Sequence, residues 1–123
     1  MIIFIYYYSK YFILVKKFSH DTNQYLKDIR KKKGLHSQKT FVRGKKLSIG
    51  IQMLRKGDNY GEPAHKNGEV YFAMKGTATL KIGKKNYKVS PGMAMYVPPK
   101  VVHRFYNIKK EFVFLFIFAG LDE

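Results

Sequence analysis

Three side chains in the second half of the sequence, His65, Glu69 and His103, are of types that together bind metal ions. Two imidazoles and one carboxylate, with coordination positions left open, form the facial set of non-haem iron sites, and Mn, Zn, Ni or Co can bind it too. The other two histidines, His20 and His36, lie in polar stretches and are interpreted as surface or hydrogen-bonded residues. We therefore expect one divalent metal ion held by His65, Glu69 and His103, with its identity open.

The sequence between the first two of these residues suggests how they meet. Asn67 and Gly68 stand between His65 and Glu69. Asn-Gly is a favoured sequence for the type I′ turn of a two-residue β-hairpin. A hairpin turn there would place the imidazole and the carboxylate close together on adjacent strands.

Alternation along extended chain predicts which neighbours share the site. Glu69 and Tyr71 fall on one face of a strand, and His103 and Phe105 on one face of another. If both faces point inward, the cation would compensate for a carboxylate in an apolar cavity. Gln52, Tyr71 and Phe105 are then candidate substrate-binding residues, although an inward Tyr or Phe also suits a plain core. No residue is assigned a catalytic role.

Short extended runs separated by turn signals follow from residue 47 onward. The runs cover residues 47–54, 69–75, 77–82, 86–89, 93–97, 102–107 and 111–118. Glycine, proline and Asn-Gly pairs lie between them, as at the ends of short strands. About seven short strands at this spacing predict an all-β sandwich or barrel of the jelly-roll class.

The last run, EFVFLFIF from Glu111 to Phe118, is apolar on both of its faces. A strand that is apolar on both sides is buried on both sides. One side would fill the barrel, and the other would lie under an N-terminal strand or in a subunit interface. This pattern is compatible with a homodimer and equally with packing inside one chain.

Residues 16–46 form a basic, polar segment in which one short helix is predicted. Asp21 or Thr22 would cap it, and it would run to about Lys33 and end at Gly34. Its apolar stripe would consist of Tyr25, Leu26 and Ile29.

The chain is strongly basic, with 24 Lys and Arg against 8 Asp and Glu and a net charge of +16. Such a surface attracts nucleic acid, anionic membranes and small acids. A solvated lysine-rich surface is the simpler interpretation, because lysine is usually exposed. Nucleic acid, bound through residues 16–46, therefore ranks behind a small-molecule ligand.

Residues 1–15, MIIFIYYYSKYFILV, are apolar and aromatic. The run is shorter than the roughly 20 residues of a spanning helix and contains Lys10, so no stable membrane span is expected. An added strand, a weak interfacial anchor and an over-extended reading frame all remain open. There is no cysteine, which excludes disulfides and thiolate chemistry but does not decide the compartment. We expect a cytoplasmic protein.

Residues 57–76, GDNYGEPAHKNGEVYFAMKG, resemble the first motif of the cupin superfamily, G-x5-H-x-H-x3-E-x6-G. Its second histidine falls on His65, its glutamate on Glu69 and its glycines on Gly57 and Gly76. Pro63 occupies the place of the first histidine, which is a metal ligand in the family pattern. The resemblance thus implies either a metal held by three ligands or a degenerate site without metal.

Residues 92–107, GMAMYVPPKVVHRFYN, resemble the second cupin motif, G-x5-P-x-G-x2-H-x3-N. Gly92, Pro98, His103 and Asn107 match, whereas Lys100 stands at the second glycine. The resemblance covers about residues 47–118. It implies a single-domain cupin, which is a double-stranded β-helix or jelly-roll barrel, here with a basic N-terminal extension.

The resemblance leaves two classes of function open. One is a mononuclear metal-dependent enzyme of dioxygenase, isomerase or lyase type that acts on a small anionic molecule. The other is a non-catalytic module that binds a sugar or small molecule, which the missing first histidine favours. Among carboxylates near the motifs, Glu62 is the nearest candidate for a general base.

Overall fold

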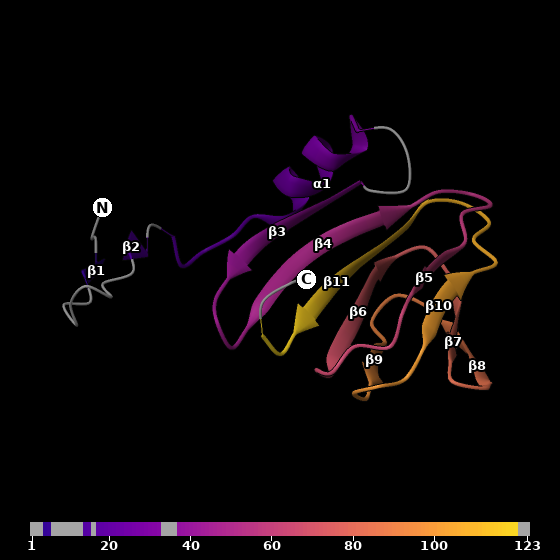
Figure 1. Cartoon of the computed structure of the whole chain (residues 1–123). Coiled ribbons are helices and arrows are strands. Elements are labelled where there is room, and N and C mark those ends of the chain that lie inside the picture. The colour runs from indigo at the N-terminus through magenta and orange to yellow at the C-terminus, as the bar shows by residue number, and fades with distance from the viewer. Residues whose placement is uncertain (1–3, 6–13, 16, 33–36, 121–123) are drawn as a thin grey trace.

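The computed structural model describes residues 4–5, 14–15, 17–32 and 37–120, and consists mainly of two antiparallel sheets that face each other (Figure 1). The elements are β1 Phe4–Ile5, β2 Leu14–Val15, α1 Thr22–Arg30, β3 Ser37–Arg43, β4 Ser48–Leu54, β5 Tyr60–Glu62, β6 Glu69–Lys75, β7 Ala78–Ile82, β8 Lys85–Val89, β9 Ala94–Val97, β10 His103–Tyr106 and β11 Phe112–Phe118. One sheet has the order β3-β4-β11-β6-β9 and the other β5-β10-β7-β8. This is the predicted all-β jelly-roll barrel with one short helix.

All seven predicted runs form strands, with bounds that differ by at most one residue at either end. Two further strands, β3 and β5, were not predicted. β3 pairs with β4 along almost its whole length, so the five-stranded sheet begins before residue 47 and includes part of the basic segment 16–46. β5 pairs with β10 at the edge of the four-stranded sheet.

The space between the two sheets is filled at one end by aromatic rings. Tyr71, Phe105, Phe112 and Phe114 are all almost fully buried. Their ring centroids lie 4.7–5.3 Å apart in tilted or edge-on contacts, the arrangements that aromatic quadrupoles favour. This packing fixes β6, β10 and β11 relative to one another, and these strands carry or adjoin the candidate site.

Helix α1 begins as the sequence predicted, because the Asp21 carboxylate accepts hydrogen bonds from the backbone N–H groups of Asn23 and Gln24. The predicted apolar stripe is buried on the sheet and consists of Tyr25, Leu26 and Ile29. The helix ends at Arg30, three residues before the predicted end. Lys33 and Gly34 lie outside the described residues.

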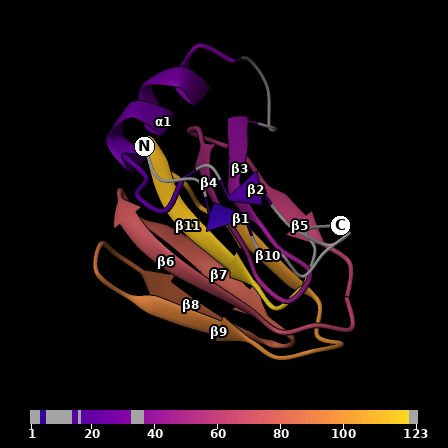
Figure 2. The same cartoon turned by 90° about the vertical axis from the view of Figure 1, so that its left-hand side faces the viewer.

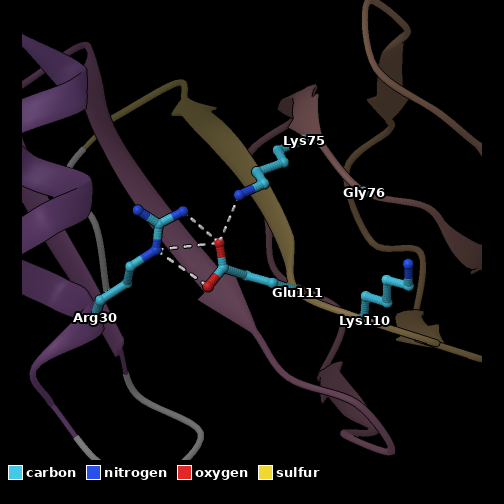
Figure 3. A pocket seen from close by; sticks show the side chains of 5 residues that line it. All are labelled: Arg30, Lys75, Gly76, Lys110 and Glu111. Atoms are coloured by element: carbon cyan, nitrogen blue, oxygen red, sulfur yellow. Dashed lines mark hydrogen bonds and ion pairs between the residues drawn. The ribbon is translucent and has the colours of Figure 1, made fainter.

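The helix covers the outer face of the five-stranded sheet near β3 and β4 (Figures 1 and 2). Its stripe packs with Ile51, Met53 and Val113, so part of the second apolar face of β11 is buried within the same chain. Figure 3 shows how the end of the helix is attached. The Arg30 guanidinium pairs with the Glu111 carboxylate beside the first residue of β11, and Lys75 approaches the same carboxylate.

Near the N-terminus, β1 and β2 pair with each other and lie apart from the two large sheets in Figure 1. Residues 1–3 and 6–13 lie outside the described residues, so the choice between an added strand, an anchor and an extended reading frame for residues 1–15 stays open. Within the described part of the chain, no helix is long and apolar enough to cross a membrane.

Candidate metal centre

Four potential ligands meet at one end of the barrel: Glu62, His65, Glu69 and His103. One ligand atom from each lies within 4.8 Å of all the others. Glu62 ends β5, Glu69 begins β6, His103 begins β10, and His65 lies in the connection between β5 and β6. The structure thus brings together all three predicted ligands and adds Glu62.

Glu62 was not predicted as a potential ligand because its strand, β5, was not predicted. Sequence analysis considered Glu62 only as a candidate base. In the structure β5 runs antiparallel to β10, and Glu62 is the cross-strand partner of His103. Directly paired residues lie on the same face of a sheet, so this register alone brings the two side chains together. Pro63, at the family's first histidine position, is next to a residue that can supply a carboxylate instead.

The separations within the cluster suit ligands around an ion. The Nε2 atoms of His65 and His103 are each 3.4 Å from Glu69 Oε1 and 3.6 Å from Glu62 Oε2. A charge-assisted hydrogen bond would be shorter, about 2.7–2.9 Å. Metal bonds of about 2.1 Å at tetrahedral angles separate neighbouring ligand atoms by about 3.4 Å. The cluster therefore has the spacing of a coordination sphere.

Both imidazoles are oriented by their other nitrogen. His65 Nδ1 lies 2.7 Å from the Asn67 carbonyl oxygen, and His103 Nδ1 lies 2.9 Å from the Val101 carbonyl oxygen. A carbonyl oxygen can only accept, so in each ring Nδ1 carries the donated proton. The two Nε2 atoms are buried and have no hydrogen-bond partner. In the neutral rings they are bare lone pairs directed at carboxylates, which is the arrangement of metal-binding histidines.

Each carboxylate is held by a tyrosine hydroxyl. Tyr60 donates to Glu62 at 3.0 Å, and Tyr71 donates to Glu69 at 2.8 Å. Burial and the adjacent carboxylate raise the pKa of each tyrosine, so both hydroxyls stay protonated donors at neutral pH. Each hydrogen bond limits how its carboxylate can rotate.

Without a metal, a proton takes the place of the cation. Burial by itself lowers the pKa of His103, but Glu62 and Glu69 outweigh it and raise that pKa to about 10. Burial likewise raises the pKa of Glu62, but His103 and Tyr60 outweigh burial and leave that pKa below its usual value. The carboxylates therefore attract positive charge, which a proton or a metal ion can supply.

The expected Asn-Gly hairpin is wrong. Neither Asn67 nor Gly68 has a positive φ, which a type I′ turn requires at both positions. β5 and β6 belong to different sheets, so His65 lies in a connection that crosses between sheets. The loop is tied by a 2.7 Å hydrogen bond from the Lys100 backbone N–H to the His65 carbonyl oxygen. The His65 ring packs edge-on against the rings of His103 and Phe118.

A cleft of about 850 Å³ leads to the cluster. Its lining residues include Gln38, Arg43, Gln52, Tyr60, Glu62, His65, Lys66, Glu69, Phe116 and Phe118. Of the three candidate substrate-binding residues, the structure places Gln52 on the cleft wall. Tyr71 and Phe105 lie in the packed aromatic interior, from which the Tyr71 hydroxyl reaches Glu69.

One wall of the cleft depends on a glycine. Gly50 faces the Phe116 ring so closely that an added Cβ would lie 2.1 Å from a ring carbon. Such contacts do not occur between real atoms, so a side chain at position 50 would displace the ring. Glycine at this position therefore permits Phe116 to occupy the wall.

Comparisons with known proteins agree with this geometry. Residues 50–118 match the family model described as "Cupin domain". The chain is 32% identical over 79 residues to the uncharacterized protein SCO3923 of Streptomyces coelicolor, which covers 64% of this chain and 75% of that protein.

Solved structures with the same fold include KdgF from a Halomonas species, with a TM-score of 0.65, 13% identity and coverage of 70% of this chain and 79% of that one. An RmlC-like cupin from Shewanella frigidimarina gives a TM-score of 0.64 at 18% identity, covering 70% and 77% of the two chains. At these identities the likeness shows the fold alone.

Proposed function

This chain belongs to the cupin family, and we propose that its cluster binds one divalent transition-metal ion through His65, Glu69, His103 and Glu62. The observation that carries the proposal is the pair of buried Nε2 atoms without hydrogen-bond partners, both facing carboxylates. Imidazole and carboxylate ligands suit Fe, Mn, Zn, Ni and Co alike, so the donor set does not select among them.

We further propose that the protein acts on a small anionic molecule that enters the cleft. A bound ion would polarise an oxygen of that molecule as a Lewis acid. The residues of the chain would orient the ligand, since the cleft wall offers the amide of Gln52, and Arg43 and Lys66 give it positive charge. This combination of a cation site and a basic cleft supports an anionic ligand.

A specific observation also favours the alternative, a non-catalytic module that binds a small molecule. Of the described residues that line the cleft, the only carboxylates are Glu62 and Glu69, and both belong to the cluster. With the metal bound, neither would remain free as a general base. Product analysis after incubating the metal-loaded protein with a bound ligand separates the two functions. Recovery of the ligand unchanged would favour the binding module.

The metal is tested by elemental analysis of the purified wild type and three variants. We expect about one ion per chain in the wild type and almost none in His65→Ala and His103→Ala. His20→Ala is the matched control, since it removes a histidine that contacts Tyr25 and Phe41, away from the cluster, and it should keep its metal. Negligible metal in all four proteins, after growth and reconstitution with each of the five metals, would contradict the proposal.

We also propose a homodimer formed through the outer face of β6 and β9. Phe72 and Tyr96 on these strands are 39% and 62% exposed, whereas α1 covers the neighbouring part of the sheet. Light scattering at twice the chain mass would support this, and a monomer at high concentration would contradict it. A cytoplasmic location and a nucleic-acid partner for residues 16–46 stay predictions.

A further inference from the structure

The wall of the cleft formed by β3 and β4 is polar and lies mostly outside the region that matches the family model. Gln38 on β3 is the cross-strand partner of Gln52 on β4, and Arg43 is the partner of Ser48. Paired residues share a face, and residues 48, 50 and 52 alternate onto one face of β4. Gln38, Gln52 and Arg43 therefore lie on the inner face of the sheet and line the same cleft.

A bulge in β3 places the arginine on this face. The pairing of β3 with β4 shifts register between Thr40 and Val42, so one extra residue is inserted there. Without it, strict alternation from Gln38 through Thr40 would put Val42 on the inner face and Arg43 on the outer one. Bulges commonly redirect a side chain beside a functional site.

The Gln52 amide is the buried polar group in this wall that lacks a partner. Gln52 is 2% exposed, and its Nε2 has no hydrogen bond. It lies close enough to the Tyr60 hydroxyl to oppose the rise in the pKa of that tyrosine, yet it forms no hydrogen bond with it. A buried donor without a partner costs free energy, so an acceptor supplied by a ligand would be stabilised here.

Arg43 supplies the charge. It is exposed at the cleft and, among the described residues, no carboxylate forms an ion pair with it. A guanidinium presents several N–H donors in one plane and matches the two oxygens of a carboxylate. The wall therefore offers two separated donors, because Gln52 lies four residues, about 13 Å, along β4 from Ser48, the partner of Arg43. Two separated donors are complementary to a ligand that carries an acidic or hydroxyl oxygen at each end.

We propose that Arg43 on the β3–β4 wall binds a carboxylate of the ligand, while an oxygen-bearing group at the other end of the same molecule accepts from Gln52 Nε2 and reaches the metal centre. This inference rests on the proposed function, because the metal defines the other end of the ligand. The cleft volume of about 850 Å³ lies in the range of small-molecule sites. The ligand class is therefore small organic acids with a second acidic or hydroxyl oxygen, such as dicarboxylic acids and hydroxy acids.

The test uses the full chain loaded with the metal it retains, and titration calorimetry with malonate, succinate, glutarate, adipate and malate. The diamide of each of these five acids serves as an uncharged probe of the same shape. At least one acid should bind, and its diamide should bind at least roughly tenfold more weakly. Arg43→Gln and Gln52→Leu should each weaken that acid by about tenfold or more, because each removes a donor to a charged group.

Lys46→Gln is the matched control, since it removes the same charge three residues from Arg43 but from a side chain that does not line the cleft. It should change the affinity by less than about twofold. The proposal is overturned if none of the acids binds, if the diamides bind equally well, or if the two wall variants bind like the control.

Failure of this inference can be told apart from failure of the metal proposal. All three variants should keep the metal content of the wild type, because none of the altered residues is a ligand. If the wild type contains no metal, the metal proposal fails, and the same titrations on metal-free protein still test the wall. If both wall variants of the metal-free protein then lost acid binding, this would support a site for the ligand's carboxylate that needs no metal. Unchanged binding in both variants would reject such a site.

Discussion

The interior of the barrel has two ends that are built from the same strands but differ in polarity and in packing. On β10, His103 belongs to the candidate metal centre and Phe105 to the aromatic core, and on β6 the same relation holds between Glu69 and Tyr71. In each pair the residues are two apart, so they point to the same side of the sheet. One end is closed by packed rings, and the other is an open cleft with ligand atoms held apart.

The comparison shows how a small protein keeps a polar cluster in fixed positions. The two carboxylates and two imidazoles would rearrange if their strands could shift, since the carboxylates and imidazoles are 3.4–3.6 Å apart and form no direct hydrogen bonds to one another. The packed end supplies the rigidity, because dense aromatic contacts resist movement of the backbone. The open end can then keep its ligand atoms at separations that a metal ion fills.

The largest expected effect comes from breaking the packed end. Phe114 is fully buried among Tyr71, Phe105 and Phe112, and Phe114→Ala should reduce the free energy of unfolding by about 3–5 kcal/mol. Urea denaturation measures the loss. Tyr87→Ala, which truncates a side chain that is 40% exposed on the edge strand β8, is the control and should change the stability much less. Equal losses in both variants would mean that this end does not provide the rigidity.

The next effect comes from filling the open end. A metal ion that binds only the folded protein, at a free concentration a hundred times its Kd, should raise the free energy of unfolding by about 2.7 kcal/mol. Thermal melting with and without the ion measures the gain. His103→Ala should abolish it, whereas His20→Ala should keep it. A gain that survives in His103→Ala would place the ion elsewhere in the molecule.

The stability of the metal-free protein should depend on pH through the open end and not through the packed end. The pKa of His103 is raised to about 10, above the ordinary histidine value, so this contribution to stability is full below about pH 6.5 and is lost as the pH rises through 10. We expect the free energy of unfolding in a chelator to fall between pH 7 and 8.5, by at most about 1.4 kcal/mol per pH unit.

In this window Tyr60 and Tyr71 do not interfere, because tyrosine in the unfolded chain ionises only near pH 10. His103→Gln should flatten the pH dependence of the free energy of unfolding. Phe114→Ala should lower that free energy at every pH and leave its pH dependence unchanged. A slope that is the same in wild type and His103→Gln would show that the carboxylates do not hold a proton on this ring.

The smallest expected effect lies at the rim of the open end. Lys100 has a φ of 64°, a left-handed conformation that costs most residues about 1–2 kcal/mol, and glycine avoids that cost. Part of the gain is offset by the entropy of glycine in the unfolded chain, so Lys100→Gly should stabilise by about 0.5–1 kcal/mol. Lys88→Gly, in the exposed middle of β8, should destabilise instead, and chemical denaturation of both variants compares them.

Local signals in the sequence predicted most of the barrel and part of the site. The start of α1 followed from Asp21, and the strands of the two motifs followed from short apolar runs between turns. His65, Glu69 and His103 followed from their types and their match to the cupin spacing. Lys100 stands at a motif glycine, and in the structure it occupies a left-handed position, which glycine adopts most easily.

The missing parts depend on pairing between distant segments. β5 has only three residues and no alternating apolar pattern, so nothing local marks it as a strand, and Glu62 reaches the cluster only through its pairing with β10. The pairing of β3 is similar, because SQKTFVR is mostly polar and gains its place by hydrogen bonding to β4. The Asn-Gly hairpin was mispredicted because the two flanking strands join different sheets.

The position of β5 has a consequence for how the centre exchanges its ligands. β5 lies at the edge of its sheet and is held by hydrogen bonds to one neighbour, whereas β10, which carries His103, is held on both sides. The cost of displacing a ligand residue follows the number of backbone bonds that must break. Among the three residues of the cluster that lie on strands, Glu62 would therefore yield first, and an incoming molecule could take its place at a bound ion.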